Sequence, residues 1–129
     1  MTSTSTCDAR GYQIMGHVPA GCRLFFADDN MNWPHLRAGE WAVIDENDTE
    51  IIEGELFLIK MGTGRIREII FQVLQRPEGI FCHPFNRPRS KEQVDRWLRD
   101  RRPMWLGDGP YREEHLAEKM LGRMIGIYQ

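Results

Sequence analysis

The sequence predicts a mostly β domain with one helical segment inserted at about residues 90–102. Short apolar runs that are rich in β-forming residues follow one another between turn signals along most of the chain. Only after Ser90 does the pattern change to helical spacing, with apolar residues at positions i, i+3 and i+4. Several short strands in series favour a barrel-like or folded-sheet architecture.

Length and composition suit a single domain. The 129 residues are enough to bury one hydrophobic core. No apolar run approaches the roughly 20 residues that span a bilayer, so we expect no membrane association. The polar amino terminus has no signal-peptide pattern. We therefore predict a flexible tail over residues 1–11, one domain over residues 12–129 and a cytoplasmic location.

The cysteine count and the charge exclude several classes of protein. Cys7, Cys22 and Cys82 are odd in number and show no C-x-x-C spacing, which indicates free thiols rather than a disulfide framework or a zinc site. The histidines show no metal-binding spacing either, so we predict no metal and no cofactor. A formal net charge of −2 argues against a chain that binds nucleic acid over its whole surface.

Turn residues divide the first part of the chain into three predicted strands. Residues 12–18 form an apolar run that ends at Pro19, and residues 23–27 form a second run that ends at the turn formers of residues 28–30. Pro34 is a poor helix residue. After it, residues 41–45 are short and rich in β-formers, which is typical of a strand.

The next part of the chain predicts a hairpin. Residues 56–61 and 65–74 are strand-like runs joined by a glycine-rich turn. Residues 80–83 form another short strand. Residues 111–119 have the composition of a short helical turn, and residues 121–128 are predicted to end the chain as a strand.

A helix is predicted to begin at Ser90. Gln93 follows three residues later, which is the spacing of a capping box. Pro103 is predicted to end the helix. The apolar face of this helix consists of Val94, Trp97 and Leu98.

The helical segment is also the most basic part of the chain. Residues 87–102 contain seven basic and three acidic residues, within a chain of net charge −2. Such a segment can dock on phosphates or on an acidic protein partner, with Trp97 or Trp105 as an aromatic contact. The simpler interpretation, which we favour, is an amphipathic helix that buries its apolar face and pairs Asp95 and Asp100 with nearby arginines. The candidate binding residues are Arg87, Arg89, Lys91, Arg96, Arg99 and Trp97.

A series of short motifs resembles one known family. The motifs, in chain order, are Asp28-Asp29-Asn30-Met31, Gly39-Glu40, Ala42-Val43-Ile44-Asp45, Gly54-Glu55, Ile66-Arg67-Glu68-Ile69, His83-Pro84-Phe85-Asn86 and residues 122–127. Their order is similar to the carboxy-terminal domain of LexA-type repressors and UmuD-type proteins, a superfamily of self-cleaving serine-lysine peptidases. The resemblance implies a LexA-like fold of curled β-sheets that is often dimeric through the last strand region.

The chain departs from this family at both catalytic positions. The position of the nucleophilic serine holds Asn30, and the position of the lysine base holds Arg67, or Glu68 if the alignment has no gap. A carboxamide is no nucleophile, and arginine stays protonated at physiological pH. Ala20-Gly21 resembles the self-cleavage bond of the family but lies too close to Asn30 in sequence.

The departures predict a non-proteolytic module that forms a homodimer or binds another protein, in bacterial or phage regulation. Two alternatives stay open. The first is a self-cleaving or other hydrolase with a rebuilt active site that uses Lys60 and a cysteine. The second is a nucleic-acid accessory protein that uses residues 87–102. Cys82 and His83 do not form a catalytic pair in this prediction, because neighbours in a strand point to opposite faces.

Overall fold

The computed structural model describes residues 6–7, 11–100 and 108–129. Its elements are β1 (Thr6–Cys7), β2 (Gln13–Met15), β3 (Cys22–Phe26), β4 (Trp41–Asp45), β5 (Leu56–Met61), β6 (Arg67–Arg76), β7 (Gly79–His83), α1 (Lys91–Arg99), β8 (Asp108–Tyr111), α2 (Glu113–Ala117) and β9 (Met120–Tyr128). The predicted mostly β class, with a helix in the expected place, is confirmed. Pro103, Trp105 and most of the predicted tail lie outside the described residues.

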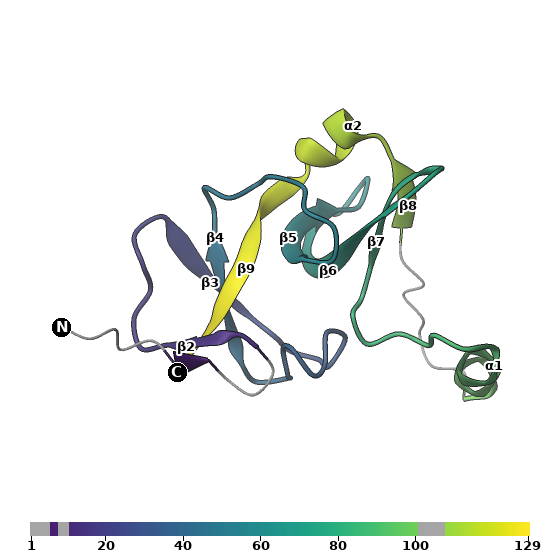
Figure 1. Cartoon of the computed structure of the whole chain (residues 1–129), viewed down its shortest axis with the longest axis horizontal. Helices are drawn as coiled ribbons and strands as arrows, with labels where there is room; N and C mark the ends of the chain where they lie inside the picture. Colours follow the sequence, from purple (N-terminus) through teal and green to yellow (C-terminus); the bar gives the residue numbers. More distant parts are fainter. Residues whose placement is uncertain (1–5, 8–10, 101–107) are drawn as a thin grey trace.

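The last strand organises the sheet. The nine described strands join one sheet. β9 pairs with β4 along one edge, and with β5 and then β2 along the other edge. Two groups of strands thus meet at β9, as Figure 1 shows. The predicted folded-sheet architecture is present, but over the described ranges the sheet ends at β1, β3 and β8 and stays open, so it is no closed barrel.

Two of the predicted strands pair in a way that the sequence did not indicate. β2 runs parallel to β9, with Gln13 opposite Gly126. β3 instead pairs antiparallel with β4. The predicted hairpin is confirmed as β5 and β6, with Met61 opposite Arg67. Thr6–Cys7, inside the predicted tail, pairs antiparallel with β2.

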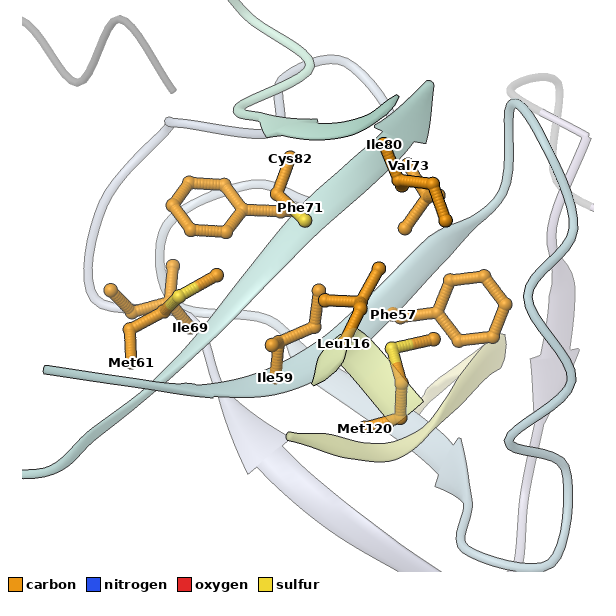
Figure 2. Packing of buried hydrophobic residues seen from close by; sticks show 10 residues of the cluster. All are labelled: Phe57, Ile59, Met61, Ile69, Phe71, Val73, Ile80, Cys82, Leu116 and Met120. Atoms are coloured by element: carbon orange, nitrogen blue, oxygen red, sulfur yellow. The ribbon is translucent and has the colours of Figure 1, made fainter. Parts of the chain in front are cut away.

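The hairpin of β5 and β6 is buried on both faces. Phe57, Ile59 and Phe71 belong to one apolar cluster, which Figure 2 shows from close by. Leu58 and Ile70, which point to the opposite face, belong to a second cluster. This alternation explains why the sequence of β5 is a nearly continuous apolar run, since a strand with two buried faces needs apolar residues at every position.

Helix α1 begins as the sequence predicts but packs differently. The Ser90 hydroxyl accepts a hydrogen bond from the backbone N–H of Gln93 at 3.1 Å. The prediction that the helix buries its apolar face is wrong: Leu98 is 60% exposed, and Val94 and Trp97 are only half-buried. The physical reason is that α1 stands away from the sheet, as Figure 1 shows, so the helix buries none of its residues against the strands.

The helices are short. No helix in the part of the chain that the structure describes is long and apolar enough to cross a membrane.

Candidate functional site

The loop between β3 and β4 is held by one buried amide side chain. Asn32 is only 3% exposed. Its Nδ2 donates to the carbonyl oxygen of Ile70 in β6 at 2.9 Å, and its Oδ1 accepts from the backbone N–H of Phe85 at 3.0 Å. One side chain thereby ties the loop both to the sheet and to the corner that follows β7. The role of Asn32 was not predicted, because nothing in the local sequence distinguishes this residue from a turn residue.

Asn30, at the predicted nucleophile position, is exposed and takes part in the structure of the same loop. Its Oδ1 accepts from the backbone N–H of Ala38 at 2.9 Å. Its carbonyl oxygen accepts from the backbone N–H of Trp33 at 3.1 Å and from Nδ2 of Asn86 at 3.0 Å. The side chain therefore closes the loop through its bond to Ala38, and the backbone carbonyl of Asn30 accepts the other two bonds.

A pocket of about 110 Å³ lies between this loop and the start of β6. It is lined by Phe25, Ala27, Asp28, Asp29, Met31, Asn32, Leu36, Arg67, Glu68, Ile69 and Ile70. The structure thus brings the segment around Asn30 to the same pocket as Arg67 and Glu68, the two candidate positions for the base. Glu68 also forms an ion pair with Arg23, with 2.5 Å between nitrogen and oxygen.

The lining of this pocket does not contain the serine and lysine that the resembled peptidases use. As far as the structure describes the chain, the lining residues include no serine, threonine, cysteine or lysine. Acyl transfer by covalent catalysis needs a nucleophile and a base that can accept its proton. The carboxylates and the guanidinium of this pocket can bind and orient a polar group, but they do not form such a pair.

The described thiols are not activated. Burial, assisted by Asp108, raises the pKa of the Cys82 thiol to about 12. Burial also raises the pKa of Cys22, with further contributions from Asp45 and Glu46. Both thiols are therefore protonated at neutral pH and are poor nucleophiles.

His83 and Lys60, the candidate bases for a cysteine nucleophile, have other neighbours in the structure. Cys82 is fully buried while the adjacent His83 is only half-buried and stacks on Phe81, with 6.0 Å between ring centroids. Lys60 is exposed and lies opposite Glu68 in the pairing of β5 with β6.

A second pocket, of about 240 Å³, lies between α1 and the segment before it. It is lined by Asn86, Arg87, Pro88, Gln93, Arg96, Trp97 and Asp100, and we name it the α1 pocket. It gathers three of the six predicted binding residues: Arg87, Arg96 and Trp97.

The guanidinium of Arg87 attaches one wall of the α1 pocket to β6 and to the corner after β7. Its Nη1 donates to Oε1 of Gln72 at 3.0 Å and to the carbonyl oxygen of Pro84 at 2.9 Å. A residue that the sequence suggested for partner binding therefore also has a structural role.

The other three predicted binding residues do not line the α1 pocket. Arg89 donates to the backbone carbonyl oxygen of Phe85 at 2.6 Å, and its guanidinium carbon lies over the Phe85 ring, 4.8 Å from the ring centroid. It attaches the start of α1 to the corner after β7. Lys91 and Arg99 are exposed on α1.

Over the described ranges, no group of three or more His, Cys, Asp or Glu side chains is placed to hold a metal ion. His35 packs against two aromatic side chains: the centroid of its ring lies 4.3 Å from that of Phe85 and 5.5 Å from that of Tyr12.

Comparisons with protein-family models, with curated proteins and with solved structures find no match to this chain. The resemblance to the LexA/UmuD superfamily therefore rests on the motifs in the sequence.

We predict that Asn32→Ala lowers the free energy of unfolding by about 3 kcal/mol, because it leaves the carbonyl of Ile70 and the N–H of Phe85 buried without their partner. Urea denaturation with linear extrapolation measures this change. Asn47→Ala is the matched control: Asn47 is exposed, and its loss should change stability by no more than about 0.5 kcal/mol. Equal effects of the two variants would contradict the role given to Asn32.

We also predict that Cys82 in the folded protein reacts with iodoacetamide at mildly alkaline pH at least about a thousandfold more slowly than in urea. A raised pKa means that less thiolate is present at a given pH, and the thiolate is the reactive form. Peptide mapping by mass spectrometry measures the rate at each cysteine. Rapid alkylation of native Cys82 would show an accessible, activated thiol and would reopen the cysteine hydrolase interpretation.

Proposed function

We propose that this chain is a non-proteolytic module that resembles the LexA/UmuD peptidase domain and acts in bacterial or phage regulation by forming a homodimer or by binding another protein. The observation that carries this proposal is the pocket beside Asn30. Its walls come from the segments that the resemblance assigns to the active site, yet Asn30 is used to close its own loop. A pocket that retains these lining segments but lacks a serine nucleophile is suited to binding a group of a partner rather than to cleaving a peptide bond.

The alternative enzyme interpretation has less support. It requires Lys60 and a cysteine to act together, but Cys82 is fully buried and its thiol has a raised pKa. Lys60 is exposed and lies opposite Glu68 in the β5–β6 pair, whereas Cys82 lies opposite Val73 in the β6–β7 pair.

The proposed homodimer uses the region of the last strand. Along β9 both edges are hydrogen-bonded to neighbouring strands, so self-association there involves a face of the sheet. Phe26, Trp41 and Tyr128 lie in register across β3, β4 and β9. Phe26 and Trp41 are 45% and 42% exposed and pack together at 4.9 Å. Aromatic side chains of this kind are enriched at protein interfaces.

The absence of proteolysis is tested by incubating the purified chain for several days at mildly alkaline pH and following its intact mass. We expect the mass to stay constant, since the pocket supplies no nucleophile, and we expect no modification by a fluorophosphonate probe beyond that of the urea-unfolded chain. Specific cleavage after Ala20, lost in the Asn30→Ala variant, would contradict the proposal.

The homodimer is tested by sedimentation velocity over a range of protein concentrations. We expect a concentration-dependent dimer, and we expect Trp41→Ser to weaken it at least about tenfold, as the loss of a central aromatic contact does. Ile66→Ser is the matched control, because Ile66 is also exposed, at 60%, but lies in the connection between β5 and β6 and not in the paired strands β3, β4 and β9. A monomer at all concentrations, or equal effects of both variants, would exclude this interface.

A further inference from the structure

β3 has a hydrogen-bonded neighbour along one edge only. It pairs antiparallel with β4, and over the described ranges it pairs with no other strand. The N–H of Ala27, one residue past β3, donates to the carbonyl oxygen of Glu40 at 2.9 Å. Bonded and non-bonded pairs alternate along an antiparallel ladder. The backbone N–H and C=O groups of Leu24 and Phe26 therefore point away from β4, to the side on which the described residues offer them no partner.

Of the three strands at which the described sheet ends, β3 is the least protected against pairing. Natural sheet edges are usually kept from pairing by short strands, proline, lysine or bulges. β1 is two residues long, and β8 contains Pro110, which has no N–H to offer a neighbour. β3 has five residues, none of them proline or lysine, and its register with β4 is continuous. Its one charged side chain, Arg23, is engaged by Glu68.

The side chains beside this free edge are apolar. Leu24 and Phe26 lie on the same face of β3, because they are two residues apart. Leu24 is half-buried, and Phe26 is 45% exposed and packs against Trp41 with 4.9 Å between the ring centroids. The free edge is therefore continuous with the aromatic face on which the homodimer is proposed.

The sequence of β3 suits antiparallel pairing with β3 of a second copy. When Phe25 lies opposite Phe25 of the second copy, Leu24 lies opposite Phe26, and the free N–H and C=O groups of both residues find partners. Leu24 and Phe26 then form apolar cross-strand pairs on the outer face. Arg23 lies opposite Ala27, so no like charges meet across the join.

The neighbouring register is less favourable. With Leu24 opposite Leu24 of the second copy, Phe26 would lie opposite Cys22. The N–H of Cys22 already donates to the carbonyl oxygen of Pro19 at 3.1 Å. The carbonyl of Phe26 would then lack a donor, which favours the register with Leu24 opposite Phe26.

We propose that β3 pairs antiparallel, along its free edge, with β3 of a second copy of this chain, with Leu24 of each copy opposite Phe26 of the other. This inference rests on the proposed homodimer and names the strand that joins the two copies. Main-chain hydrogen bonds supply the attraction in this mode of recognition, and the side chains set the register. Phe26 connects the join with the exposed aromatic face, because its ring packs on Trp41.

The test measures amide hydrogen exchange by NMR in the ¹⁵N-labelled full chain, at concentrations below and above the dimerisation midpoint found by sedimentation velocity. We expect the amides of Leu24 and Phe26 to exchange at least about tenfold more slowly in the dimer, because each gains an acceptor there. The amide of Phe25 is the internal control. It points toward β4 and should be equally protected at both concentrations.

Two variants at Leu24 separate the main-chain pairing from the loss of a side chain. The N–H of Leu24 points away from β4, so Leu24→Pro removes no hydrogen bond to β4 but removes a donor from the free edge. Leu24→Ala is the matched control, since it shortens the side chain and keeps the N–H. We expect Leu24→Pro to weaken dimerisation at least about tenfold more than Leu24→Ala does, with circular dichroism to confirm that both variants fold. The exchange experiment uses the unaltered chain and decides the matter if Leu24→Pro does not fold.

Three results would overturn the inference: fast exchange at Leu24 and Phe26 in the dimer, slow exchange there at every concentration, or equal dimerisation of folded Leu24→Pro and Leu24→Ala. Slow exchange at every concentration would mean that another part of the same chain covers the edge. A dimer that Trp41→Ser weakens, but in which Leu24 and Phe26 stay unprotected, would remove the edge contact and leave the proposed homodimer in place. A monomer at all concentrations would exclude the homodimer itself.

Discussion

The double hydrogen bond of Asn32 is the constraint on which both pockets depend. It fastens the loop after β3 to β6 through Ile70 and to the corner after β7 through Phe85. The loop forms one wall of the pocket beside Asn30, and the corner leads directly into α1. A buried amide is well suited to this task, because its donor and acceptor can satisfy two backbone groups that would otherwise be costly to bury.

The polar residues near the pockets hold neighbouring segments of the chain together. Asn30 closes its loop, and Arg87 and Arg89 attach the approach to α1 to the rest of the chain. These bonds leave α1 away from the sheet with an exposed apolar residue and a pocket beside it.

The accuracy of the sequence prediction differs between elements for physical reasons. The strand over residues 41–45 and the N-cap at Ser90 were predictable, because each depends on residues close together in the chain. The parallel pairing of β2 with β9 joins residues near opposite ends of the chain, and no local pattern encodes it. The exposure of Leu98 was mispredicted because helical spacing identifies an apolar face but not what covers that face. The role of Asn32 was missed for a related reason, since its two partners lie in distant segments.

By itself, the sequence determined the β class, the hairpin, the position of the helix, and the presence of an asparagine and an arginine where the resemblance places a serine and a lysine. These features follow from residue type and local spacing. Only the tertiary structure decided that the segment of Asn30 shares a pocket with Arg67, that Cys82 is buried with a protonated thiol, and that Arg87, Arg96 and Trp97 surround one cavity. Those properties depend on which distant segments meet and on how much water they exclude.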